Sequence, residues 1–331
     1  MRILVTGSAG HLGEALMRTL PAAGHDAVGL DIRPSTFTHA VGSIADRAFV
    51  EQWMRGIDAV LHTATLHKPH VATHSRQEFI DVNVSGTLAL LEAAVAACVR
   101  AFVFTSTTST FGGALVPPAG APAAWITEDV VAVPKNIYGV TKVMAENLCE
   151  LVHRASRMPC LVLRTSRFFP EEDDSAAARQ RYADGNLKAN EFLYRRADIA
   201  DIVDAHVCAL DRAADIGLGR YIISATTPFR VEDLQALRND APALVKRLFP
   251  QYEALYGIRG WRMFPSVDRV YVNDRARREL GWIPKCDFAW VLDRLATDQE
   301  PRSDLARVVG SKGYHAQTFV EGPYPVERVE N

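Results

Sequence analysis

The strongest constraint on the fold is a glycine-rich turn close to the N-terminus. A short apolar run, residues 2–6, leads directly into a G-x-x-G-x-x-G segment at residues 7–13, and leucines then recur at four-residue spacing as far as Leu20. This order predicts a strand, a tight turn and a helix. Glycines let a main chain approach a phosphate closely, and a helix N-terminus offers unpaired N–H groups to negative charge. The segment therefore predicts a dinucleotide site whose contacts include Gly7, Ala9, Gly10, His11, Leu12 and Gly13.

Short apolar runs and helical patterns alternate through the first half of the chain. Strand-like runs end near Asp31, Asp46, Ala64 and Phe104, and another covers residues 159–163. Such alternation is typical of an α/β fold with a doubly wound, parallel Rossmann-type sheet and a smaller C-terminal substrate-binding lobe. We expect an NAD-binding domain over residues 1–166, to which 197–226 return. Residues 167–196 and 227–331 would form the smaller lobe and a tail.

An acidic residue at the end of the second predicted strand bears on the choice of cofactor. Asp31 follows the glycine turn at about the distance at which a carboxylate binds the adenosine ribose, about 20 residues. A carboxylate there repels the extra phosphate of NADP, so we predict NAD. Arg33 stands two residues further on and is a candidate phosphate contact, and Ser43 and Ile44 are expected beside the adenine.

Two later strands end in small or hydroxyl-bearing residues. His62, Thr63 and Ala64 close one of them, and Asn83 lies in the helix that follows. The next strand runs into six consecutive hydroxyl residues, 105–110. Ligands of open parallel sheets bind at the carboxyl ends of strands. We therefore expect Thr105 and Ser106 near the cofactor, and a hydroxyl from the same run beside the substrate.

A Tyr-x-x-x-Lys pair opens a long amphipathic helix. Tyr138 and Lys142 are four residues apart, so their side chains leave the same face of that helix. A free tyrosine has a pKa of about 10, and a nearby ammonium favours its phenolate form. The spacing thus predicts a phenol with a lowered pKa that accepts a proton from an alcohol.

The composition excludes several other classes. Charged residues make up 23% of the 331 residues and the formal net charge is −2, which gives no basic surface for nucleic acid or an anionic membrane. Five cysteines stand far apart, which favours free thiols in a reducing cytoplasm over disulfides or a metal site. No apolar run approaches the roughly 20 residues that span a bilayer, and no signal peptide is evident. We expect a cytoplasmic protein.

The motifs occur in the order typical of extended short-chain dehydrogenases/reductases, the group called the NAD-dependent epimerase/dehydratase family. The resemblance covers residues 1–296 and rests on these segments: Thr6–Gly13, Asp31, His62–Ala64, Asn83–Thr87, Thr105–Gly112 and Tyr138–Lys142. It implies that Thr107, Tyr138 and Lys142 are catalytic, with Lys142 lowering the pKa of Tyr138 and holding the nicotinamide ribose. It also implies a homodimer through helices 76–98 and 135–157. The segment 273–284 resembles the C-terminal signature of the family, which implies packing of the small lobe.

One segment departs from the best-known relatives. Nucleotide-sugar epimerases usually have asparagine where Arg167 stands, and here the acidic run 171–174 follows, which reads as a solvated loop. The segment is similar to that of uronate dehydrogenases, whose substrates are free sugar acids. Arg167, Arg179 and Arg181 are candidates for a carboxylate or phosphate fork. The residues expected to contact substrate are Thr65, His67, Thr107, Thr108, Ser109, Arg167 and Arg179.

Three functions remain open at this point. The first is an NAD-dependent oxidoreductase/epimerase that acts on a secondary alcohol of a sugar or sugar derivative. The second is a dehydrogenase of a free sugar or sugar acid. The third is a dinucleotide-binding sensor or scaffold without catalysis, which the presence of both Tyr138 and Lys142 disfavours. Dehydration ranks below epimerisation because Thr108 and Ser109 stand where dehydratases carry an Asp-Glu pair.

Overall fold

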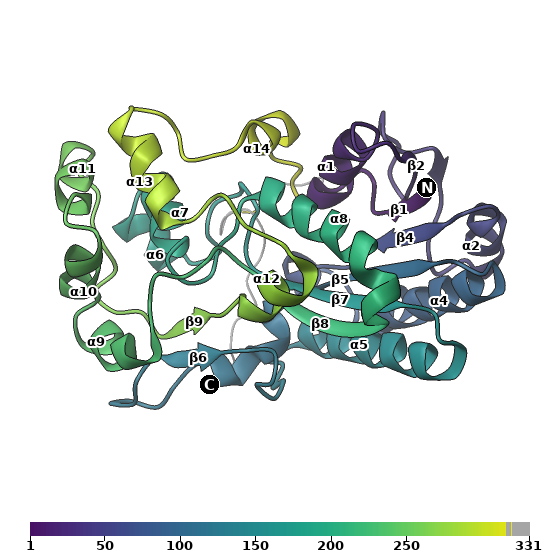
Figure 1. Ribbon diagram of the computed structural model, residues 1–331, viewed down its shortest axis with the longest axis horizontal. Coiled ribbons are helices and arrows are strands. Elements are labelled where there is room, and N and C mark those ends of the chain that lie inside the picture. The colour runs from purple at the N-terminus through teal and green to yellow at the C-terminus, as the bar shows by residue number, and fades with distance from the viewer. Residues whose placement is uncertain (316–318, 320–331) are drawn as a thin grey trace.

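A computed structural model describes residues 1–315 and residue 319. Its main feature is a seven-stranded sheet in which every pair of neighbouring strands is parallel (Figure 1). The predicted α/β class and the Rossmann-type order are therefore confirmed. In spatial order the strands are β3 (Ala40–Val41), β2 (Asp26–Asp31), β1 (Arg2–Thr6), β4 (Ala59–His62), β5 (Ala101–Thr107), β7 (Cys160–Thr165) and β8 (Leu218–Ile223).

Alternate strand residues face opposite helical layers, as the two-residue period of a strand requires. Ile3 and Val5 of β1 pack in one core cluster, while Leu4 between them packs in another. The first layer holds α1 (His11–Thr19), α8 (Ile199–Ile216), α12 (Asp274–Leu280) and α14 (Asp304–Val309). The opposite layer holds α2 (Arg47–Met54), α4 (Gly86–Ala96) and α5 (Ile137–Ser156).

The helical run before β5 contains an irregular turn. It begins as α3 (Arg76–Ile80), widens into a π-helical turn, η2 (Asp81–Ser85), and continues as α4. By length and composition, residues 76–96 are apolar enough to cross a membrane, contrary to our expectation that no run would be. Half of this stretch is buried, and Leu90 and Leu91 pack beneath the sheet. It is a core helix of this fold.

A smaller group of elements extends beyond the carboxyl ends of the strands, with α9, α10 and α11 stacked farthest from the sheet (Figure 1). Its core includes Phe192, Tyr256 and Phe288. The elements are α6 (Ala176–Arg181), α7 (Asp184–Glu191), η4 (Val231–Asp233), α9 (Leu234–Asn239), α10 (Ala241–Leu248), α11 (Tyr252–Ile258), α13 (Phe288–Ala296) and a two-stranded sheet of β6 (Ala124–Ile126) with β9 (Arg269–Tyr271).

Two details differ from expectation. The segment 273–284 packs on the main core, not on the smaller one, because Leu280 and Trp282 lie among residues of α8 and the indole of Trp282 donates to the Asp201 oxygen. The strand β6 had no sequence signal, and it brings residues from before α5 to the smaller lobe. The exact division of the chain into two domains stays a prediction.

Candidate active site

A cavity of about 800 Å³ opens at the carboxyl ends of the strands. It lies where the strand order reverses between β1 and β4, which is where ligands of doubly wound sheets bind. Most of the predicted contact residues line it: Gly7, Gly10, His11, Leu12, Gly13, Asp31, Arg33, Ser43, Ile44, Thr63, Ala64, Thr65, His67, Thr105, Ser106, Thr107, Thr108, Ser109, Tyr138, Lys142 and Arg167.

The glycine turn has the shape that a dinucleotide requires. Gly7 has φ of +76°, and a Cβ there would lie 2.9 Å from the main-chain nitrogen of Ala64. A Cβ on Gly13 would lie 1.9 Å from the Gly7 oxygen, so only glycine lets α1 start this close to β1. A Cβ on Gly10 would have a single close neighbour, the Gly7 oxygen at 3.2 Å. The glycines thus leave the main chain at the N-terminus of α1 without side-chain atoms next to the cavity, which fits the close approach of a pyrophosphate.

The carboxylate of Asp31 is held at the end of β2 by main-chain groups. It accepts hydrogen bonds from the N–H of Ala9 at 3.0 Å and of Arg33 at 2.9 Å. The main chain of Ala9 therefore holds the Asp31 carboxylate in place, and Ala9 does not line the cavity. The charge of Asp31 faces the same cavity as the glycine turn, as the prediction for an adenosine ribose requires.

Tyr138 and Thr107 meet at the carboxyl end of β5. Asn136 caps α5 through the Gly139 N–H, so Tyr138 lies in the first turn of that helix. Its side chain is buried and hydrogen-bonded to Thr107. Burial raises the pKa of Tyr138 to about 12, although the Thr107 hydrogen bond acts in the opposite direction. The expected lowering of this pKa is therefore wrong for the described structure, because desolvation of the phenolate outweighs the stabilising contacts.

Lys142 is anchored to the sheet. Its Nζ donates to the Thr105 oxygen at 2.6 Å and lies 4.0 Å from the centre of the Phe104 ring. Burial lowers its pKa to about 7, and the charges of Glu146 and Cys149 act against that shift. Glu146, one turn later on α5, accepts from Ser106 at 2.6 Å and forms a buried ion pair with Arg164 at 2.7 Å. The face of α5 that carries Lys142 and Glu146 is thus tied to β5 and β7 by polar contacts.

Two predicted contact residues lie behind the cavity wall. His62 is buried, and its ring bonds Thr6 at 2.8 Å and Thr87 at 2.9 Å. Burial lowers the pKa of His62 well below its ordinary value, so the ring is neutral. Asn83, in the π turn, accepts from the Leu66 N–H at 2.7 Å and donates to Thr141 at 3.1 Å. Both side chains position the wall of the cavity, and neither lines it.

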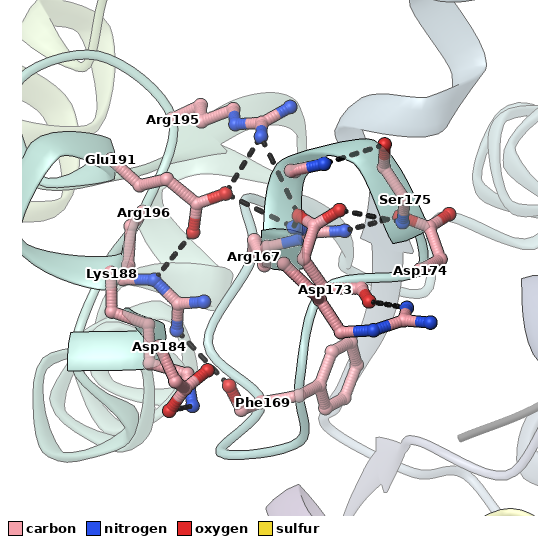
Figure 2. A network of polar contacts seen from close by, with 12 residues as sticks. Arg167, Phe169, Asp173, Asp174, Ser175, Asp184, Lys188, Glu191, Arg195 and Arg196 are labelled. Carbon is pink, nitrogen blue, oxygen red and sulfur yellow. Dashed lines mark hydrogen bonds and ion pairs between the residues drawn. The ribbon is translucent and has the colours of Figure 1, made fainter. Parts of the chain in front are cut away.

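The acidic run is not a solvated loop, contrary to expectation. Arg167 forms ion pairs with Asp173, with Asp174 at 3.2 Å and with Glu191 at 3.0 Å (Figure 2). Glu191 is buried and also pairs with Arg195 and Arg196. These partners hold the pKa of Glu191 well below its ordinary value, although burial by itself raises it. The guanidinium fork of Arg167 is therefore already engaged by the protein's own carboxylates.

Arg179 and Arg181 lie outside the cavity lining. Arg179 donates to the Asp173 oxygen and lies 3.9 Å from Glu172. The main-chain oxygen of Arg181 accepts a hydrogen bond from Arg262. In the described structure these two residues support the loop and the small lobe, and do not form the predicted fork.

Several lining residues had not been predicted. One group follows β4, next to the predicted contact residue His67, whose ring lies 6.1 Å from that of Tyr138. Burial, with the charges of His70 and Lys142, lowers the pKa of His67 well below its ordinary value. Within the described residues, no group of three His, Cys, Asp or Glu side chains suits a metal ion. The unpredicted residues include Lys68, Pro69, His70, His74, Phe168, Phe169, Arg195, Arg269, Tyr271 and residues 312–315.

Comparison with known proteins assigns the family. The profile of the NAD dependent epimerase/dehydratase family matches residues 3–223. The chain belongs to this family. It is therefore an NAD-dependent enzyme of the extended short-chain dehydrogenase/reductase type, as the motifs predicted.

Individual relatives extend the likeness over the whole chain. A UDP-glucose 4-epimerase of Lactobacillus helveticus is 33% identical over 244 residues, which cover 63% of this chain and 72% of that enzyme. A UDP-glucose 4-epimerase of Rhizobium leguminosarum bv. trifolii is 27% identical over 343 residues, covering 91% and 98%. A solved structure of a short-chain dehydrogenase/reductase superfamily protein from Agrobacterium tumefaciens, with bound NAD, has a TM-score of 0.65 and 27% identity, covering 93% and 99%.

Proposed function

We propose that this enzyme is an epimerase that acts on a secondary alcohol of a sugar or sugar derivative. The observation that carries the proposal is the grouping of Tyr138, Thr107 and Lys142 in one cavity with the glycine turn. The likeness to two UDP-glucose 4-epimerases supports a nucleotide sugar as the substrate. When bound, NAD accepts a hydride from the carbinol carbon and can return it to the other face.

The three side chains have distinct tasks in this proposal. Thr107 orients the substrate oxygen, since its hydroxyl is already hydrogen-bonded to Tyr138. Tyr138 exchanges the hydroxyl proton. Its pKa of about 12 keeps the phenol protonated at neutral pH, so the phenol can donate its proton to a substrate carbonyl oxygen. Lys142, one turn further on the same helical face, fixes α5 to β5 through the Thr105 oxygen.

A second candidate is the dehydrogenation of a free sugar or sugar acid. Besides Arg167, the cavity is lined by Arg195 and Arg269, where an anionic substrate would meet two further guanidinium groups, each already paired with a carboxylate, Glu191 or Asp268. Net oxidation releases NADH, whereas epimerisation leaves the cofactor reduced only transiently. The two candidates thus differ in the redox state of the cofactor at the end of the reaction.

The test is a panel of UDP-sugars, free sugars and sugar acids, each incubated with the full-length enzyme and NAD. Product NMR follows the configuration at each carbon, and absorbance follows NADH. Epimerisation of a UDP-sugar without net NADH would support the first candidate. NADH formed in step with an oxidised free sugar would support the second. A protein that binds NAD and converts no member of the panel would contradict both.

We also infer a cytoplasmic homodimer. Three apolar side chains are partly exposed along the outer side of α5: Val140 at 38%, Met144 at 41% and Leu151 at 52%. Helices α3 and α4 lie next to α5, so a partner that covers this side of α5 would also approach them. A monomer in light scattering at micromolar concentration would contradict the homodimer, and fractionation of cells tests the location.

A further inference from the structure

Residues 311–315, here called the covering segment, contact the cavity and have no part in the function proposed above. Lys312, Gly313, Tyr314 and His315 all line the cavity that contains the glycine turn and Tyr138. The covering segment follows α14, which packs on the main core beside α1. Its position is therefore fixed at one end by the dinucleotide-binding half of the molecule.

One carboxylate fastens the covering segment to the glycine turn. Oε1 of Glu171 accepts hydrogen bonds from the Ser311 hydroxyl at 2.7 Å, the Lys312 N–H at 3.2 Å and the Gly313 N–H at 3.3 Å. The same oxygen lies 2.7 Å from Nε2 of His11, the residue after Gly10. Burial alone would raise the pKa of Glu171, but His11 and Ser311 lower it to about 2, so the carboxylate is charged at neutral pH.

The other end of the covering segment is held by the loop after β4. Nε2 of His70 lies 3.2 Å from the Tyr314 oxygen, and Nε2 of His315 lies 3.0 Å from the Pro69 oxygen. The Tyr314 ring packs against His11 at 6.0 Å and His67 at 5.9 Å between ring centres. The covering segment thus joins the start of α1 to the loop after β4, two segments that follow the neighbouring strands β1 and β4.

This placement affects access to the glycine turn. Dinucleotide phosphates bind at the N-terminus of the helix that follows such a turn, here beside His11. The amine of Lys312 also forms an ion pair with Glu14, one turn into α1. The covering segment therefore lies at the end of the cavity where these phosphates would bind.

We propose that the covering segment is part of the dinucleotide site and closes it, so that NAD enters or leaves only after Glu171 releases residues 311–313. The proposal rests on the assignment of NAD as the cofactor, but it needs no particular substrate. Retention of the cofactor suits a reaction that returns the hydride to its own product. When the covering segment is closed, the Tyr314 side chain covers the interior of the cavity.

Stopped-flow fluorescence of NADH with the full-length protein tests the proposal. In the unmodified protein, the observed association rate should reach a plateau as NADH rises, because opening of the covering segment limits entry. Release of bound NADH, followed by displacement with excess NAD, should be slow. Glu171→Ala should abolish the plateau and raise the release rate about tenfold or more, because hydrogen bonds to a charged group are lost.

Two further variants separate closure from general damage to the site. Glu172→Ala is the matched control, since Glu172 is 66% exposed and its nearest cation is Arg179 at 3.9 Å. It should leave both rates within about twofold. Tyr314→Ala should raise the entry and release rates together, whereas damage to the site would raise release and slow entry. Unchanged rates in Glu171→Ala and Tyr314→Ala, or a linear concentration dependence in the unmodified protein, would overturn the proposal, whatever the substrate panel shows.

Discussion

The Nζ atom of Lys142 lies 2.6 Å from the main-chain oxygen of Thr105, at the start of the hydroxyl-rich end of β5. This contact joins the helix that carries Tyr138 to the strand that carries Thr107. The two residues for which we propose proton transfer and orientation of the substrate oxygen are therefore held in one rigid arrangement. The same contact holds an amine that burial has made unusually weak as a base, with a pKa of about 7.

Replacement of the phenol tests the chemical role of Tyr138. Tyr138→Phe removes the hydroxyl but keeps the ring, so kcat should fall about 10²–10⁴-fold, as for loss of a general acid–base group. NAD affinity, measured by calorimetry, should stay within about threefold. Tyr194→Phe, a buried tyrosine of the smaller core, is the control and should keep its turnover. Normal turnover by Tyr138→Phe would exclude the proposed role.

The depressed pKa of Lys142 predicts a pH-dependent stability. The folded protein loses this proton near pH 7, whereas the unfolded chain keeps it until about pH 10.5. Between these values the unfolded state binds the extra proton, so the free energy of unfolding rises with pH, by at most about 1.4 kcal/mol per unit from this group. Lys142→Met should lack this rise of the free energy of unfolding with pH. Urea midpoints at pH 7.5, 8.5 and 9.5 measure it, and parallel curves for the two proteins would contradict it.

The carboxylate of Asp31 should decide the preference between NAD and NADP. Asp31→Asn removes the charge at nearly the same shape, so NADP should bind about tenfold more tightly and NAD more weakly. Asp26→Asn, at the opposite and exposed end of the same strand, is the matched control and should change neither affinity. Fluorescence titrations with both reduced cofactors give the ratio. Equal affinities in the unmodified enzyme would refute the assignment.

Two glycines in helices should respond oppositely to alanine. Gly13→Ala would place a methyl 1.9 Å from the Gly7 oxygen, which should cost about 1–3 kcal/mol or more and weaken NAD binding. Gly257 in α11 is exposed, and its Cβ would have no neighbour within 4 Å. Gly257→Ala should therefore stabilise the fold by about 0.5 kcal/mol. Thermal unfolding of the two variants checks the signs, and a stabilised Gly13→Ala would show that α1 does not start this close to β1.

The paired state of Arg167 predicts a structural cost rather than a simple loss of substrate affinity. Arg167→Met leaves Asp173, Asp174 and Glu191 with less compensation, and should destabilise the fold by about 3 kcal/mol. Arg212→Met removes an exposed pair with Asp215 and should cost less than about 1 kcal/mol. Urea unfolding compares them. If Arg167→Met is as stable as the unmodified protein and only its KM is raised, the result would support Arg167 as the predicted fork for a substrate anion.

Local patterns were sufficient for much of the site. The glycine turn, Asp31 and the Tyr138–Lys142 pair are each defined by residues close in sequence, and the parallel sheet places them around one cavity. Their spacing could not give the pKa of Tyr138, because burial depends on residues from several elements.

Partners distant in sequence explain what the patterns missed. Glu171 and Asp173 belong to an acidic run, which by composition alone favours solvent. Glu171 contacts His11 and residues 311–313, and Asp173 contacts Arg167 and Arg195. Except for Arg167, six residues before Asp173, these partners lie far from the acidic run in the sequence. The same holds for Tyr314, which reaches His67 from the other end of the described chain.

The π-helical turn at residues 81–85 fixes the rotational phase of everything that follows it in the same helix. Asn83 faces Leu66 and Thr141 only because the wide turn holds one residue more than an ordinary turn would. Removal of one residue there would rotate α4 by about 100° relative to α3. Leu90 and Leu91 of α4 would then turn out of the core that they now fill, so this stretch should tolerate substitution far better than any change in its length.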